Sequence, residues 1–192
     1  MVGVAHCTTA ELLAGLDLIE ASPSDDGVLE LIVRRPAEGE REVLEVAELS
    51  IDEGLVGDCW LARGSRSSPD GAAVPGRQLT IMNARAIALF AGDRARWPLA
   101  GDQLYVDLDL SDDNLPAGTR LQLGEATIEV SPEPHTGCAK FLERFGRDVS
   151  RFINGPEGMR LHLRGINARL ITSGKIRAGD LATKVLLHDR VV

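Results

Sequence analysis

Residues 119–131 read Thr-Arg-Leu-Gln-Leu-Gly-Glu-Ala-Thr-Ile-Glu-Val-Ser, the clearest strand pattern in the chain. Apolar and polar side chains alternate on both sides of Gly124-Glu125, which is the pattern of two half-buried strands joined by a tight turn. A period of two residues cannot gather the apolar side chains on one face of a helix. We therefore predict a β-hairpin here.

Other segments carry a similar strand pattern, with short alternating or apolar runs bounded by turn residues. Polar residues at 36–40 join the first two of these runs, so a hairpin is the simplest arrangement for them. The further predicted strands cover residues 28–34, 42–49, 78–82, 104–109, 166–172 and 180–187.

Helices are expected where the apolar spacing changes to three and four residues. Thr8 and Glu11 form a capping box at the start of the first helix, and Asn83 is placed to cap the second. Gly92 and Gly146 are placed to end two of the helices. The predicted helices lie before residue 22 and at residues 84–90, 138–145 and 148–153.

The predicted elements do not show the regular strand–helix alternation of a parallel sheet. They number about seven or eight short strands and three or four helices. We expect an α+β, mainly β fold: a curved or closed β-barrel with appended short helices. Residues 51–76 are rich in Gly, Ser, Pro, Asp and Arg and are expected to form a long loop. A loop of that length in a compact domain is usually functional or disordered.

The composition is that of an ordinary globular domain. Of the 192 residues, 44% are hydrophobic and 26% are charged, whereas only 4% are aromatic, so Leu, Val, Ile and Ala must build the core. This length fits one domain with a short appendage. We expect an N-terminal helical extension at 1–26 and the main domain at 27–192.

Charge and hydropathy argue against two classes of partner. The formal net charge of −8 opposes binding to phosphate backbones, so nucleic acid is not an expected partner. No apolar run approaches the roughly 20 residues of a membrane helix, and the first residues lack the pattern of a secretory signal. We expect a cytoplasmic protein without a membrane partner.

One cysteine stands in a setting that favours chemistry. The cysteines are Cys7, Cys59 and Cys138, too few and too far apart for a disulfide framework or a CxxC motif. Cys138 follows a proline-rich bend and begins a predicted helix, whose unpaired amides and dipole favour an anion. Lys140 and His135 add positive charge nearby. A thiolate in such a place is a nucleophile, a carrier of persulfide sulfur or a ligand for a soft metal.

A second interpretation of Cys138 stays open. Cys138, Phe141, Leu142 and Phe145 are spaced so that they share one helical face, which is the spacing of a core stripe. Free cysteine is among the most buried residue types. In this interpretation Cys138 is an inert residue of the hydrophobic core.

Several other polar residues have both a functional and a structural interpretation. Arg77, Arg164 and Arg169 each carry a guanidinium that suits a phosphate or carboxylate ligand, but solvated surface arginines are common. His135, in the bend, suits hydrogen bonding and acid–base work alike. The aspartates within 107–113 lack the Gly and the distal Glu of an EF-hand loop, so we expect an acidic edge there rather than a cation site.

Taken together, several segments resemble a MOSC domain, the module that ends molybdenum-cofactor sulfurases. Their order and spacing match from about residue 27 to the end, and the combination is more specific than any single segment. The matching segments are Gly54-Leu55-Val56-Gly57-Asp58, Arg77-Gln78-Leu79-Thr80, Asp113-Asn114-Leu115, Ile128-Glu129-Val130-Ser131-Pro132, Cys138 with Lys140 and Phe145, Leu163-Arg164-Gly165-Ile166, and Gly174-Lys175-Ile176-Arg177-Ala178-Gly179-Asp180.

The resemblance implies a MOSC-type β-barrel with a pocket, in which Cys138 ligates the molybdenum of a pterin cofactor or carries sulfur toward a metal–sulfur cluster. Relatives that act as enzymes reduce N-hydroxylated compounds, and the family is associated with pyridoxal phosphate through fusion to cysteine-desulfurase-like domains. The implied partner is a sulfur donor such as a cysteine desulfurase, or a redox partner. The implied cofactor-binding residues are Lys140, Arg164, Asn114, Asn167, Arg169, Arg77 and His135.

The sequence departs from the family pattern at two places. Cys59-Trp60 follows Gly57-Asp58 where many bacterial relatives have a basic residue and His, and Pro134-His135 stands where Pro-Arg is frequent. The chain also contains no desulfurase domain, so we expect it to need a separate sulfur donor. These departures keep an alternative open: a non-catalytic binding module that retains the barrel without cofactor chemistry.

Overall fold

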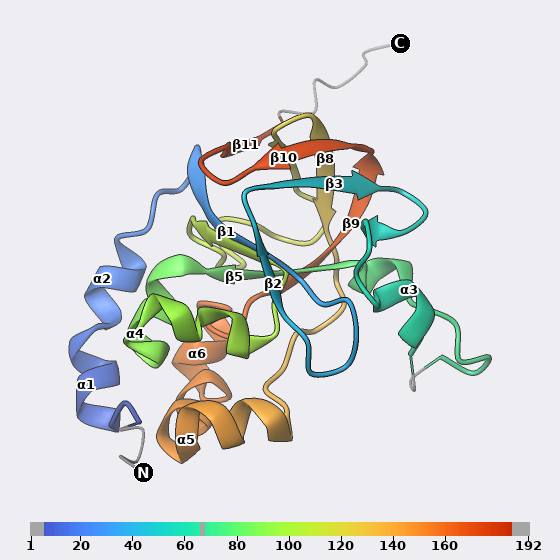
Figure 1. Cartoon of the computed structure of the whole chain (residues 1–192). Coiled ribbons are helices and arrows are strands. Elements are labelled where there is room, and N and C mark those ends of the chain that lie inside the picture. The colour runs from blue at the N-terminus through green and yellow to red at the C-terminus, as the bar shows by residue number, and fades with distance from the viewer. Residues whose placement is uncertain (1–5, 66–67, 186–192) are drawn as a thin grey trace.

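A seven-stranded β-barrel forms the centre of the molecule in the computed structural model, which describes residues 6–65 and 68–185 (Figure 1). Around the barrel the strands follow the order β1 (Gly27–Arg34), β6 (Leu104–Asp107), β5 (Leu79–Asn83), β9 (Ile166–Thr172), β8 (Ala126–Val130), β7 (Arg120–Leu123) and β11 (Leu181–Lys184). Pairing of β1 with β11 closes the barrel, and β2 (Glu42–Leu44) extends the sheet beside β1. The expected α+β, mainly β barrel is confirmed.

The hairpin of β7 and β8 confirms the pattern from which the fold was predicted. The two strands pair antiparallel, with Leu121 opposite Ile128 and Leu123 opposite Ala126. Buried and half-exposed residues alternate along both strands, because one face of the hairpin lines the barrel interior. Gly124 lies in the turn with a φ of 54°, a region that glycine enters without a steric penalty.

A crossover joins the barrel's parallel strands, β5 and β6. The chain leaves β5 through α4 (Ala84–Ala91) and returns through the 3₁₀ helix η2 (Arg94–Ala100). The side chain of Asn83 accepts a hydrogen bond from the amide of Ala86, and Gly92 ends α4 with a φ of 69°. The predicted caps of this helix are therefore confirmed.

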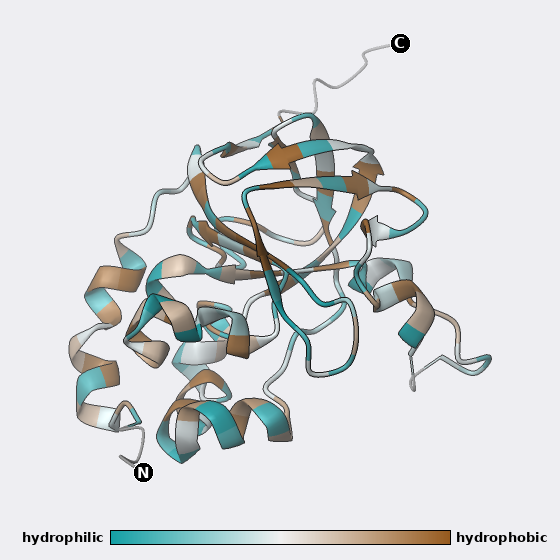
Figure 2. Cartoon of the chain, in the orientation of Figure 1, coloured by the Kyte–Doolittle hydropathy of each residue, from teal (hydrophilic) through white to brown (hydrophobic). Residues whose placement is uncertain are grey.

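Two apolar clusters lie on the two sides of the barrel wall. One fills the barrel, and the other lies between the wall and the helices that gather on one side of it (Figure 1). Strand β1 serves both clusters, since Leu29 and Ile32 face the barrel interior while Leu31 and Val33 face the helices. Figure 2 shows apolar residues along the strands and mixed colours along the outer helices. These helices are α1 (Thr9–Ala14), α2 (Leu16–Glu20), α4, α5 (Ala139–Ile153) and α6 (Pro156–Arg160).

The N-terminal segment, expected as an extension at 1–26, packs onto this helical layer. Thr8 and Glu11 form the predicted capping box, and the expected single helix is two short ones that meet at Gly15. Leu12 is fully buried in the helical cluster. Residues 1–5 lie outside the described residues. None of the helices within the described ranges has the length and apolar character needed to cross a membrane.

Three local predictions are wrong. The expected strand at 42–49 bends at Glu45, and its second half is β3 (Val46–Ser50) of a separate small sheet. That sheet also holds β4 (Gly54–Leu55) and β10 (Gly174–Arg177), and no strand was expected at either place. It lies across one end of the barrel (Figure 1) and places Ala47, Leu49, Leu55 and Ile176 in the barrel core.

The third correction concerns residues 51–76, which are not a continuous loop. They contain β4 and α3 (Trp60–Arg63), and the 3₁₀ helix η1 (Pro75–Arg77) begins at their end. The Gly57-Asp58 pair of this segment has a structural role. The Asp58 carboxylate pairs with buried Arg35 at 2.8 Å and accepts a hydrogen bond from the amide of Trp60. Burial lowers the pKa of Arg35, but the hydrogen bonds that Arg35 donates to Asp58 and the negative charge of that carboxylate together raise the pKa above its ordinary value.

Candidate functional site

A bend at 131–138 carries the candidate residues away from the end of β8. The amide of Ser131 donates to the carbonyl of Asn167, which extends the β8–β9 pairing by one residue. The Asn167 side chain then donates to the carbonyls of Glu133, at 3.0 Å, and Pro134, at 3.1 Å. Asn167 is buried, so these two hydrogen bonds fix the path of the bend against β9.

An ion pair lies buried beneath the bend. A guanidinium nitrogen of Arg164 is 2.6 Å from Oδ2 of Asp102, and a second donates to the carbonyl of Ala100 at 3.1 Å. The Asp102 side chain is fully buried and that of Arg164 is 8% exposed. The guanidinium also lies over the ring of Phe141, 4.8 Å from its centroid. Arg164 is therefore held by three contacts and already has a carboxylate partner.

His135 completes a buried group of three with Asp102 and Arg164. Its Nδ1 is 3.5 Å from Oδ1 of Asp102, and neither of these atoms has a hydrogen-bond partner in the described structure. Burial, and secondarily the charge of Arg164, lower the pKa of His135 to about 3. The imidazole is thus uncharged at neutral pH.

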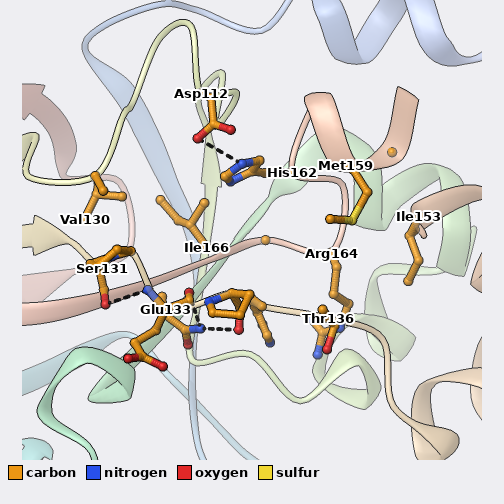
Figure 3. Close-up of a pocket in the computed structure, with 17 residues that line it drawn as sticks. Asp112, Val130, Ser131, Glu133, Thr136, Ile153, Met159, His162, Arg164 and Ile166 are labelled. Atoms are coloured by element: carbon orange, nitrogen blue, oxygen red, sulfur yellow. Dashed lines mark hydrogen bonds and ion pairs between the residues drawn. The ribbon is translucent and has the colours of Figure 1, made fainter. Parts of the chain in front are cut away.

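A cavity of about 220 Å³ opens beside this group, between the bend and the turn that leads from α6 into β9. Figure 3 shows the pair of Asp112 and His162 at one edge of the cavity and the side chains of Ile153 and Met159 near Arg164. His162 Nε2 is 3.2 Å from Asp112 Oδ1. The cavity therefore combines an apolar side with two imidazoles, each of which lies beside a carboxylate.

Cys138 lies at the exposed end of the same bend. It occupies the N-cap of α5 in an extended conformation, and its thiol is exposed rather than packed in the core. The interpretation of Cys138 as a core residue is therefore wrong. Phe141 and Phe145 are buried as their spacing predicts, whereas Leu142 is 42% exposed. Cys138 does not share the buried helical face, because helical dihedral angles begin only at Ala139, one residue after the N-cap.

Helix α5 also joins two segments that were predicted separately. It runs to Ile153 and includes both predicted helices, at 138–145 and 148–153. Gly146 interrupts it with a φ of 89°, so the predicted stop is present as a kink.

The predicted site residues do not all converge on this cavity. His135, Arg164 and Asn167 line it, whereas Cys138 and Lys140 lie outside its lining. The exposed Lys140 pairs with Glu38, which is also exposed.

The remaining three predicted residues also lie outside the cavity lining. Arg77 pairs with Glu133 at 2.8 Å, and Arg169 pairs with Glu129 at 2.6 Å in a neighbouring depression. Asn114 accepts a hydrogen bond from Lys184 at 2.6 Å. These three residues therefore do not join His135, Arg164 and Asn167 in one site.

Sequence patterns do not single out three residues of this region. Asp102 follows Gly101 in a dipeptide that is typical of turns, although its side chain is fully buried. His162 has no metal-ligand spacing to other histidines, and Met159 carries no motif. A positive φ of 48° at His162 turns its side chain toward Asp112, and no pattern in the sequence indicates such a conformation.

The acidic stretch at 107–113 behaves as an edge with local partners. Asp107 pairs with Arg85 at 2.7 Å, and Asp109 accepts a hydrogen bond from the amide of Ser111. Within residues 6–65 and 68–185, no group of three or more His, Cys, Asp or Glu side chains is arranged to hold a metal ion.

The fold is similar to that of several proteins of known structure. No protein-family model and no curated protein sequence matches the chain. A crystal structure described as a hypothetical protein has a TM-score of 0.58 at 20% identity, covering 88% of this chain and 71% of that one. YuaD from Bacillus subtilis has a TM-score of 0.58 at 17% identity, covering 82% and 96%. YiiM from Escherichia coli has a TM-score of 0.54 at 20% identity, covering 82% and 69%.

YuaD and YiiM are MOSC-domain proteins, so the barrel described above is of the MOSC type. At these identities the likeness concerns the fold.

Proposed function

We propose that this protein handles sulfur through Cys138, which accepts a sulfane sulfur from a donor protein or ligates a soft metal in molybdenum-cofactor chemistry. The observation that carries the proposal is the exposed thiol at the N-cap of α5. Thiolates are favoured at helix N-termini, and they must be accessible to react with another macromolecule. Cys7 and Cys59 are less exposed, and burial, then the charges of Glu11 and Asp148, raises the pKa of Cys7.

The sulfur transfer needs no electron acceptor. The Cys138 thiolate attacks the outer sulfur of a persulfide on the donor, such as a cysteine desulfurase. A new S–S bond forms at Cys138 while the donor's S–S bond breaks, and the donor's own thiolate leaves with the electron pair. The persulfide on Cys138 then lies on the exposed end of the bend, within reach of a receiving partner.

The residues present fit a molybdenum-pterin cofactor only in part. A thiolate such as that of Cys138 is a suitable ligand for a soft metal. An anionic pterin phosphate also needs cationic side chains that can turn toward it. Each basic residue predicted for that role already pairs with a carboxylate; the pairs are Arg164–Asp102, Arg77–Glu133, Arg169–Glu129 and Lys140–Glu38.

The proposed sulfur transfer therefore does not involve the pterin. Three further roles stay predictions from the resemblance. They are binding of the molybdenum-pterin cofactor, binding of pyridoxal phosphate, and reduction of N-hydroxylated compounds with a redox partner. The sulfur-carrying role needs only the thiol and a donor.

Persulfide labelling tests the proposal. The protein is incubated with a cysteine desulfurase and cysteine, and intact mass spectrometry with peptide mapping locates any added sulfur. We expect one added sulfur on Cys138, lost in Cys138→Ser and kept in the matched control Cys59→Ser. Equal labelling of the Cys138→Ser variant, or no labelling of the wild-type chain, would refute the sulfur-carrying role.

A second candidate function is a binding module without sulfur chemistry, and the paired cations favour it. The guanidinium that lines the cavity, that of Arg164, is neutralised by Asp102, so the cavity is poorly suited to an anionic cofactor but well suited to an uncharged one. In that case the labelling experiment fails while ligand binding in the cavity persists.

A further inference from the structure

The cavity beside His135 has the form of a binding site of its own. Its volume of about 220 Å³ corresponds to roughly seven water molecules. This is below the roughly 300 Å³ at which pockets for drug-sized ligands begin, so the ligand must be small. Cys138 is not among the residues that line the cavity. A ligand bound there and a sulfur bound at Cys138 are therefore separable by experiment.

The electrostatics of the lining disfavour an anion. Two nitrogens of the Arg164 guanidinium donate to Asp102 and Ala100, while its Nε has no hydrogen-bond partner. Turning the whole guanidinium to a ligand would leave a buried carboxylate unpaired. Asp112 and Glu133, which also line the cavity, are carboxylates, and Glu133 is paired with Arg77. His135 adds no positive charge to the lining, because its pKa of about 3 leaves it uncharged at neutral pH.

The orientation of His135 is fixed from two sides. Gly165 has a φ of 101°, and a Cβ there would lie 3.2 Å from His135 Nδ1 and 2.3 Å from the carbonyl oxygen of Ile81. The absence of a side chain at Gly165 makes room for the imidazole. On the other side Asp102 Oδ1 lies 3.5 Å from Nδ1 and is an acceptor toward which a proton on that nitrogen can point.

The charge of Asp102 favours one tautomer of His135. The buried Asp102 carboxylate can only accept a hydrogen bond, so it favours the imidazole that carries its proton on Nδ1. The other ring nitrogen, Nε2, then has a free lone pair and is an acceptor. His135 thus offers a hydrogen-bond acceptor in a cavity that also has apolar walls.

We propose that this cavity binds a small uncharged molecule, which donates an N–H or O–H hydrogen bond to Nε2 of His135 and packs its apolar part against Ile153, Met159 and Ile166. Small aromatic amides and alcohols have this chemistry. The proposal does not depend on sulfur transfer at Cys138.

Three related probes test it by NMR titration: benzamide, methyl benzoate and benzoate. All three carry the same ring, but only benzamide is both uncharged and a hydrogen-bond donor. We expect benzamide to bind roughly fivefold more tightly than methyl benzoate, the value of about one neutral hydrogen bond. Benzoate, an anion among carboxylates, is expected to bind at least roughly tenfold more weakly than benzamide.

Two variants complete the design. His135→Phe keeps a ring in place without an acceptor and is expected to remove the preference for benzamide over methyl benzoate. Cys138→Ser is expected to leave benzamide binding unchanged while abolishing persulfide labelling, so the two proposals fail separately. Tighter binding of benzoate than of benzamide, an unchanged preference in His135→Phe, or no binding of any probe would each overturn the proposal.

Discussion

His135 and Cys138 are three residues apart in one bend, yet they lie in opposite environments. The His135 side chain is 13% exposed and faces a buried carboxylate, whereas the Cys138 thiol is exposed at the start of a helix. The buried end is held by Asn167, Asp102 and Gly165, and the exposed end only by the helix that follows. A single short segment can therefore combine a rigid binding surface with an accessible nucleophile.

The two ends of the bend also differ in how far their charged groups are solvated. Around His135 the charges are desolvated, so removing one partner leaves another unpaired in a low-dielectric interior. Around Cys138 the charges of Lys140 and Glu38 are solvated, and pairs of that kind contribute little to stability. Substitutions at the two ends of the bend should therefore differ strongly in their effects.

The largest effect is expected for Asp102→Asn. The substitution leaves the buried guanidinium of Arg164 without a counter-charge, so the free energy of unfolding should fall by about 3–5 kcal/mol. Urea denaturation at neutral pH measures it. The double variant Asp102→Leu with Arg164→Met, which removes both charges, should recover most of the loss. A loss below about 1 kcal/mol for Asp102→Asn would show that the pair is not buried as described.

The next effect is a dependence of stability on pH. His135 has a pKa of about 3 in the folded protein and an ordinary value of 6.5, so the unfolded chain takes up the proton first as the pH falls. The contribution of His135 to the free energy of unfolding is then constant above pH 6.5. As the pH falls from 6.5 toward 3, this contribution decreases by about 1.4 kcal/mol per pH unit.

The variant His135→Gln isolates this contribution from that of the carboxylates. Between pH 7 and pH 5 it should lose about 2 kcal/mol less stability than the wild-type chain. The groups that face His135, namely Asp102, Arg164, Arg35 and Arg77, are the same in both proteins. Parallel stability curves for the two proteins would contradict a neutral buried imidazole.

A smaller effect is expected for Asn167→Ala. It removes two hydrogen bonds to the carbonyls of Glu133 and Pro134, which should cost about 1–2 kcal/mol in urea denaturation. Asn154→Ala, which removes one exposed hydrogen bond to Ser150, is the matched control and should cost less. Equal losses for the two variants would mean that the buried end of the bend is no more firmly held than an exposed helix end.

The sequence predicts much of this fold because local patterns determine much of it. The β7–β8 hairpin, the caps of α4 and strand β9 follow from alternation and capping residues alone. The small sheet was missed because β10 is short, with Ile176 as its single buried residue, and its pairing with β3 is non-local. Such pairing depends on how the barrel end is closed and leaves little trace in either strand.

The candidate site was predicted less completely, for a related reason. Cys138 was identified from its place before a helix, but its exposure depends on where helical geometry begins. Asp102 makes the site electrostatically distinctive, and it reaches His135 and Arg164 only through the packing of separate elements. No spacing in the sequence relates these three residues.

The smallest effect is expected at the exposed end, for Lys140→Ala. Because Lys140 and Glu38 are both solvated, the free energy of unfolding should change by about 0.5 kcal/mol or less. Iodoacetamide should modify Cys138 in the folded variant and in the folded wild-type chain at rates within roughly threefold of each other, since a solvated charge is screened at physiological salt. In both proteins Cys7 and Cys59 should react more slowly than Cys138, because they are partly buried. A much slower Cys138 in the variant would mean that Lys140 holds the thiolate, and the two ends of the bend would then both depend on fixed charges.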